Sequence, residues 1–65
     1  MTNHVRDLRT ARGWSQAELG VRVGVSRQAI IAIETGRFDP SLPLAIKLAR
    51  LFGTSIEDIF QLDEN

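Results

Sequence analysis

The stretch that decides the fold runs from Gln16 to Thr35 and reads QAELGVRVGVSRQAIIAIET. Apolar residues recur in it at three- and four-residue intervals, which is the spacing of helices that bury one side. Gly24 interrupts this pattern, because glycine readily adopts the left-handed conformation that ends a helix. Ser26 follows as a residue type preferred at the start of the next helix. The stretch therefore predicts two helices, 16–23 and 27–35, joined by a tight turn.

A turn this short cannot fold the two helices back antiparallel, so it predicts a helix-turn-helix motif. Gly20 leaves room where the two helices cross, and Val25 fills the space beneath the turn. We expect Leu19, Ile30 and Ile33 to form the apolar core that the two helices share. The second helix of such a motif can lie in the major groove of DNA, so the stretch indicates a DNA-binding protein.

The second helix has two unlike faces when its residues are placed at about 100° intervals. One face is aliphatic, and the other carries Arg27, Gln28, Ile31, Ala32 and Thr35. Arginine can bind guanine, glutamine can bind adenine, and an aliphatic side chain can contact the thymine methyl group. We therefore expect base contacts from Arg27, Gln28, Ile31 and Ala32. The alternative is that Arg27 and Gln28 only solvate a surface helix, but Ile31 would then lie in water.

Contacts to phosphate are expected on both sides of that helix. Ser15 and Gln16 stand at the start of the first helix, where free amides and the helix dipole favour an anion. Thr35 ends the second helix and Arg37 follows it, on the same side. The sequence therefore predicts phosphate contacts from these four residues.

Basic residues are concentrated in the first part of a chain whose net charge is zero. Residues 1–37 carry six arginines and three acidic residues, a net charge of +3, and residues 38–65 carry a net charge of −3. Arginine suits bidentate binding to phosphates and guanine. Arg12 and Arg22 are left open, either as outer phosphate contacts or as solvated side chains.

Serine and glycine delimit three further helices, expected at about 4–12, 42–52 and 56–61. Asn3 is the expected cap of the first of these, and Ser41 and Ser55 are the expected caps of the other two. The chain of 65 residues is thus predicted to be one all-α domain, 1–65, of five helices around a central helix-turn-helix. Only Phe60 to Asp63 alternates in a way that would suit a short strand.

Apolar residues also suggest a second copy of the chain as a partner. The apolar residues of segment 42–52 cover about twice as much of the helix circumference as the apolar face of a surface helix needs. We expect a homodimer interface formed by Leu51, Ile56, Ile59, Phe60 and Leu62. It would place two DNA-reading helices about 34 Å apart, as a palindromic site requires. In this interpretation a charged residue at Phe60 would give a monomer. The alternative is a compact monomer that uses all these residues as core.

Several functions are disfavoured by what the sequence does not contain. There is no cysteine and one histidine, so an enzyme is improbable, and neither a metal nor another cofactor is expected. No apolar run approaches the roughly 20 residues of a membrane span, no export signal is evident, and no small-molecule ligand is suggested, so we expect a cytoplasmic location. A protein-interaction module, such as an antitoxin or adaptor, is the alternative to DNA binding. Phe38 could be core, dimer contact or exposed.

The spacing of these residues resembles the Cro/C1-type (XRE-like) helix-turn-helix regulators of phages and bacteria. The resemblance covers about residues 4–60 and is carried by Leu8-Arg9, Gly13–Gln16, Val23–Gln28, Ile33–Gly36, Pro40 and Ile56–Phe60. It implies a five-helix, lambda-repressor-like domain that binds operator DNA as a two-fold dimer, and we expect a repressor. It also implies a phosphate contact by Gln16 and a buried ion pair between Arg9 and Glu34. Gly20 and Ala32 depart from the family pattern, where alanine and longer polar residues are commoner.

Overall fold

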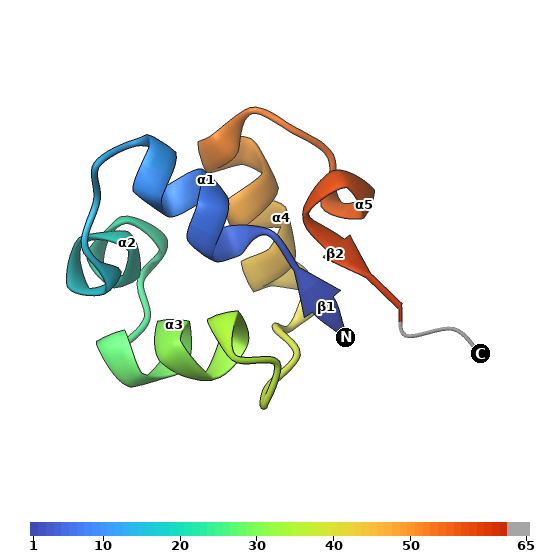
Figure 1. Ribbon diagram of the computed structural model, residues 1–65, viewed down its shortest axis with the longest axis horizontal. Coiled ribbons are helices and arrows are strands. Elements are labelled where there is room, and N and C mark those ends of the chain that lie inside the picture. Colours follow the sequence, from blue (N-terminus) through green and yellow to red (C-terminus); the bar gives the residue numbers. More distant parts are fainter. Residues whose placement is uncertain (63–65) are drawn as a thin grey trace.

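The computed structural model describes residues 1–62, and this part contains five helices and a two-stranded sheet (Figure 1). The helices are α1 (Val5–Ala11), α2 (Gln16–Val23), α3 (Arg27–Glu34), α4 (Leu42–Phe52) and α5 (Ile56–Ile59). The strands are β1 (Thr2–Asn3) and β2 (Phe60–Gln61), which pair antiparallel. The predicted helical class is confirmed, with this small sheet added to it. Residues 63–65, which the sequence places in the same domain, lie outside the described residues.

Four of the five helices begin after a serine whose hydroxyl accepts a hydrogen bond from an amide of the first turn. These caps are Ser15, Ser26, Ser41 and Ser55. Such a bond satisfies one of the amides that the start of a helix leaves unpaired. Pro43 follows in the first turn of α4, where no helical partner for its missing amide is needed. The serine positions therefore place the helix starts where the sequence predicts them.

The two ends of the described chain differ from the expectation. The helix expected at 4–12 spans Val5–Ala11, and Asn3 lies in β1 rather than at the cap position. Its side-chain oxygen nevertheless accepts a hydrogen bond from the amide of Val5 at 3.1 Å. The helix expected to reach residue 61 ends at Ile59, because Phe60 is extended (φ −115°, ψ 134°) and pairs with Asn3.

The turn between α2 and α3 depends on two glycines. Gly24 has φ +79°, a left-handed conformation that other residues rarely adopt. A Cβ at Gly20 would lie 2.6 Å from the carbonyl oxygen of Val25, closer than real Cβ contacts come. Gly20 therefore allows the turn to pack directly on α2, in agreement with the room that the sequence analysis assigned to it.

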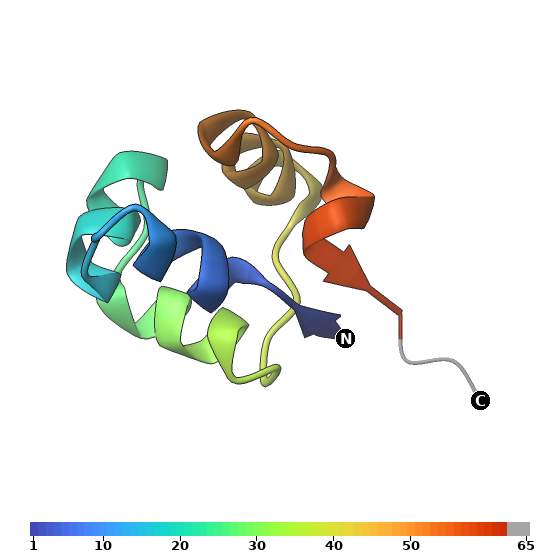
Figure 2. The ribbon, with the colours of Figure 1, turned by 45° about the horizontal axis from the view of Figure 1, so that its top comes forward.

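The core is formed by residues from every helix. The largest fully buried side chains are Val5, Leu19, Ile30, Ile33, Leu48 and Ile59. Figures 1 and 2 show α1 lying alongside α3, with α2 at one end of the molecule and α5 and β2 at the other. Within residues 1–62 no helix is long and apolar enough to cross a membrane.

The apolar surplus of α4 is largely absorbed by the chain's own core. Its buried residues are Leu44, Ala45, Leu48, Ala49 and Phe52, and α5 packs beside it. Two residues predicted as dimer contacts are buried in the same core, since Ile59 is 0% and Phe60 7% exposed. The prediction that Ile59 and Phe60 present their side chains to a second copy is therefore wrong. The width of an apolar stripe does not reveal which chain covers it.

Candidate nucleic-acid interface

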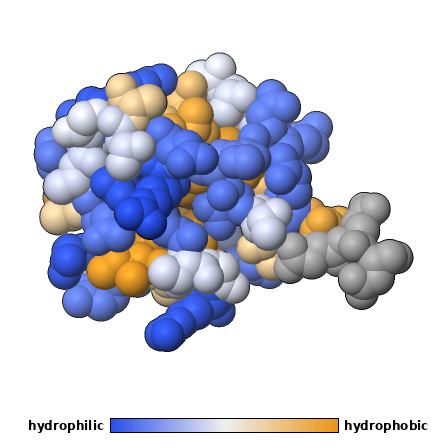
Figure 3. All heavy atoms as spheres, in the orientation of Figure 1, coloured by the Kyte–Doolittle hydropathy of each residue, from blue (hydrophilic) through white to orange (hydrophobic). Residues whose placement is uncertain are grey.

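Helix α3 has the two faces that its sequence predicts. Ile30 and Ile33 are buried, while Arg27, Gln28 and Thr35 are exposed. The other two candidate base contacts, Ile31 and Ala32, are half-buried, so each is partly accessible from solvent. Figure 3 shows an apolar patch over α3, surrounded by hydrophilic side chains. This face therefore combines accessible polar groups with an apolar strip, which is the combination that base edges and thymine methyl groups require.

The start of α2 is more fully occupied than the sequence suggests. Ser15 and Glu18 form a reciprocal capping box, in which the Ser15 amide donates to Oε1 of Glu18 at 3.0 Å. Hydrogen bonding from the backbone and the side chain of Ser15, together with the nearby charge of Arg22, lowers the pKa of the Glu18 carboxyl. Glu18 is thus a carboxylate close to the expected anion site. The amide of Ser15 is already bonded to it, and the next free amides are those of Gln16 and Ala17.

Gln16 is held by a buried ion pair. Nε of Arg9 donates to Oε2 of Glu34 at 2.7 Å, and its Nη2 donates to Oε1 at 3.2 Å. The two side chains are only 10% and 3% exposed. Nε2 of Gln16 donates to the same Oε1 at 3.1 Å, a bond that the sequence analysis missed. The ion pair implied by the family resemblance is present, and it orients a residue expected to contact phosphate.

The two phosphate contacts expected at the end of α3 differ in whether their side chains are available to bind a phosphate. The hydroxyl of Thr35 donates to the carbonyl of Ile31 at 2.8 Å, so its single proton is used within the helix. The side chain of Arg37 is exposed, and its backbone amide is fixed to the carbonyl of Ala32 at 3.0 Å. Arg37 is therefore the better donor to a phosphate, and Thr35 would first have to break its own bond.

Arg12 and Arg22 lie against Trp14 rather than beside α3. The guanidinium carbon of Arg22 is 4.1 Å from the centroid of the Trp14 ring, and that of Arg12 is 5.4 Å away. Arg12 also donates to the carbonyls of Leu51 and Phe52 at the end of α4. Cations favour this end of a helix, since its carbonyls are unpaired. The structure thus gives Arg12 a stabilising role.

The geometry agrees with the comparisons with known proteins. A family model described as helix-turn-helix matches residues 5–59. The chain belongs to the Cro/C1-type (XRE-like) helix-turn-helix family. An uncharacterized HTH-type transcriptional regulator of Methanocaldococcus jannaschii is 48% identical over 65 residues, covering 100% of this chain and 98% of that protein.

Two further relatives place this XRE-like chain among regulators of known type. The transcriptional repressor RstR of the cryptic phage CTXphi in Vibrio cholerae is 33% identical over 58 residues, covering 89% of this chain and 52% of RstR. The crystal structure of the restriction-modification controller protein C.AhdI from Aeromonas hydrophila superposes with a TM-score of 0.78 at 33% identity, covering 88% of this chain and 86% of C.AhdI. Both likenesses extend beyond the helix-turn-helix to most of the domain.

The remaining C-terminal candidates of this XRE-like domain stay at its surface. Leu51 and Ile56 are half-buried and pack against the edge of the core. Leu62, which follows β2, is 75% exposed. Phe38, whose role the sequence leaves open, is 49% exposed in the segment between α3 and α4. We call these three at least partly exposed side chains, Leu51, Ile56 and Leu62, the C-terminal apolar patch; they are fewer than the five residues predicted for the interface.

Proposed function

We propose that the protein is a sequence-specific regulator of transcription that binds double-stranded DNA through α3, its recognition helix. The observation that carries this proposal is the exposed face of α3, where Arg27, Gln28 and Ile31 lie side by side. Phosphate donors flank this face, with Gln16 on one side and Arg37 on the other. The name of RstR, a repressor, supports repression as the outcome of binding. In this proposal the protein acts by binding DNA rather than by catalysis, and it does so in the cytoplasm.

The distribution of charge supports binding by two chains on one site. Residues 1–37, which include α1, α2 and α3, carry a net charge of +3, whereas the rest of the chain carries −3. Phosphate contacts supply most of the affinity for generic DNA. A neutral chain therefore binds weakly alone, and a pair of chains on a palindromic operator doubles the number of contacts.

The proposal is tested with two arginine variants on DNA selected from a random duplex pool. Arg27→Ala is expected to weaken binding to the selected site by about 1–3 kcal/mol and to change binding to unrelated DNA little, because a base contact is lost. Arg37→Ala is the matched control: it is expected to weaken binding to both, and to reduce the slope of log affinity against log salt by about 1. Fluorescence anisotropy measures both variants.

Two results would count against this proposal. Negligible, salt-independent binding by the unaltered protein would exclude DNA as the target, since phosphate contacts make affinity fall with salt. An equal loss on all DNA for Arg27→Ala would make Arg27 a phosphate contact and leave the choice of base unexplained.

We infer further that the protein binds its operator as a homodimer through the C-terminal apolar patch. Leu62 directly follows β2, whose Phe60 is buried in the core. Within one chain the side chain of Leu62 is left 75% exposed. A second copy would cover it together with Leu51 and Ile56.

Leu62→Asp is therefore expected to halve the mass measured by sedimentation, because a carboxylate at an apolar interface loses its water without gaining a partner. Val21→Asp is the matched control: Val21 is 83% exposed on α2, away from the patch, and the same charge there should leave the mass unchanged. An unchanged mass for Leu62→Asp would show that the patch is not the interface.

A protein partner, as for an antitoxin or adaptor, is favoured by one other feature. Ala17, Glu18, Val21 and Arg22 line an open hollow of about 370 Å³ on the outer side of α2. An adaptor of this kind would not need the arginines at α3. The Arg27→Ala substitution would therefore leave binding of the protein partner unchanged, whereas a DNA-binding regulator would lose recognition of its DNA site.

A further inference from the structure

Asn3 lies where three parts of the molecule meet. It belongs to β1, which pairs with β2 near the other end of the chain. Its Oδ1 accepts from the amide of Val5 at 3.1 Å, at the start of α1. Its Nδ2 donates to the carbonyl of Ile33 at 2.8 Å, near the end of α3 and 30 residues away along the chain. One amide side chain thus connects the sheet to both helices.

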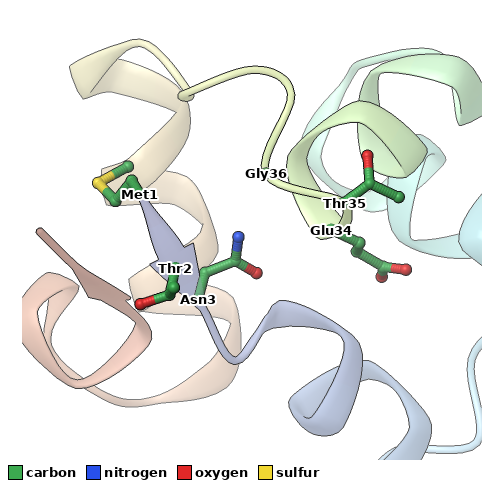
Figure 4. A pocket seen from close by; sticks show the side chains of 6 residues that line it. All are labelled: Met1, Thr2, Asn3, Glu34, Thr35 and Gly36. Atoms are coloured by element: carbon green, nitrogen blue, oxygen red, sulfur yellow. The ribbon is translucent and has the colours of Figure 1, made fainter. Parts of the chain in front are cut away.

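The connection spans a small hollow between β1 and the end of α3 (Figure 4). The hollow has a volume of about 200 Å³ and is lined by Met1, Thr2, Asn3, Glu34, Thr35 and Gly36. In Figure 4 the amide of Asn3 points toward α3, whereas the side chain of Thr2 points to the opposite side of the strand.

Two of the polar side chains that line this hollow are bonded to groups outside it. Glu34 accepts from Arg9 and Gln16, and the hydroxyl of Thr35 donates to Ile31 within α3. At this hollow the Glu34 carboxylate and the hydroxyl proton of Thr35 are therefore already used within the protein. The effect of the hollow is to separate β1 from α3, so that the contact between them at this point is made by the side chain of Asn3.

We propose that Asn3 is a positioning residue that fixes the end of the recognition helix to the sheet. The proposal rests on the proposed function, since it gives the angle of α3 a role in reading DNA. The sheet includes β2, which leads directly to Leu62 in the proposed dimer patch. Asn3 therefore links the element that contacts DNA to the segment that contacts the second copy, and sets the angle at which the two recognition faces meet the operator.

Sequence-specific binding is more sensitive to such an angle than generic binding is. Helix α3 has eight residues, about 12 Å of helix, so a small tilt at its end shifts the base-reading side chains along the groove. Directed contacts to bases require side chains to be held within about 0.5 Å, whereas a long arginine can follow a phosphate. Loss of the Asn3 contact should therefore reduce discrimination between sites.

Two variants separate this role from simple stabilisation. Asn3→Ser keeps a hydroxyl that can accept from the Val5 amide, as serine does in local turns, but it is too short to reach Ile33. Asn3→Ala loses both contacts. We expect both variants to bind the selected operator about fivefold more weakly, with unchanged affinity for unrelated DNA. Asn3→Ala, which loses both bonds, should also melt about 5 °C lower than the unaltered protein, whereas Asn3→Ser, which loses one, should melt lower by less.

Hydrogen exchange gives a readout that does not depend on DNA. The amides of Arg37 and Phe38 donate to the carbonyl of Ala32, one residue before the carbonyl that Asn3 holds. Both amides should exchange faster in Asn3→Ser than in the control Thr2→Ala, which changes the exposed neighbour in the same strand.

The proposal is overturned if Asn3→Ser retains the affinity of the unaltered protein for the operator, or if operator affinity simply follows melting temperature across the two variants. If the unaltered protein binds no duplex, the proposed function fails, and exchange at Arg37 and Phe38 still decides the proposal. Unchanged exchange would show that Asn3 does not restrain the end of α3, and faster exchange would show that it does.

Discussion

Glu34→Ala is expected to lower the free energy of unfolding by about 3–5 kcal/mol, because it leaves the charge of Arg9 buried without its partner. The Arg9 side chain is only 10% exposed, so little solvent can replace the carboxylate. A core of this size supplies only about 3–5 kcal/mol in all, so most of the variant should be unfolded at 25 °C. Urea titration followed by far-ultraviolet circular dichroism measures the loss.

The control for this prediction removes both charges. Arg9→Met combined with Glu34→Leu should recover most of the stability, since an apolar pair of similar volume often equals or exceeds a buried ion pair. Because Glu34 also accepts from Gln16 at 3.1 Å, the double variant should still bind DNA more weakly. A loss below about 1 kcal/mol for Glu34→Ala, the range of surface pairs, would show that the ion pair is solvated.

The helix starts could be predicted because their causes are local. Ser15 and Glu18 determine the start of α2 within four residues, and Ser41 acts in the same way for α4. The two faces of α3 follow equally from local periodicity, which places Ile30 and Ile33 inside and Arg27 outside. What lies within one turn of helix can be read from the sequence.

The remaining features depend on residues that are distant in the chain. Arg12 finds its acceptors at Leu51 and Phe52, 39 and 40 residues further on, and no local pattern marks such a pair. Strand β1 has two residues, too few for an alternating pattern to be recognised, whereas the alternation from Phe60 to Asp63 indicated the position of β2. Apolarity likewise indicates that a side chain will be covered and leaves open whether its own chain or a second copy covers it.

The candidate site shows the same division. The sequence predicts the roles of Gln16 and Glu34 separately, one as a phosphate contact and the other as a partner of Arg9. Their hydrogen bond joins the start of α2 to the end of α3, 18 residues apart, and it makes the ion pair a support for the proposed phosphate contact. The ion pair was predictable from the family resemblance, whereas the hydrogen bond that connects it to Gln16 was not.

Phe60→Asp is expected to unfold the chain, whereas the sequence alone favoured a folded monomer. Phe60 is 7% exposed and its strand pairs with Asn3, so the substitution affects the core and the sheet together. Truncation of a buried phenylalanine alone costs about 3–5 kcal/mol, and an unpaired carboxylate in its place adds to this loss. The helical signal in circular dichroism should therefore be largely lost at 25 °C.

Leu62→Asp provides the comparison for this result, because it introduces the same charge two residues further along, at a side chain that is 75% exposed. It should retain the helical signal and lose only the dimer. The two variants thus separate folding from association at two positions that lie two residues apart in one segment. If Phe60→Asp kept its helical signal and merely halved the sedimenting mass, Phe60 would be a dimer contact and the pairing of β1 with β2 would not be needed for the fold.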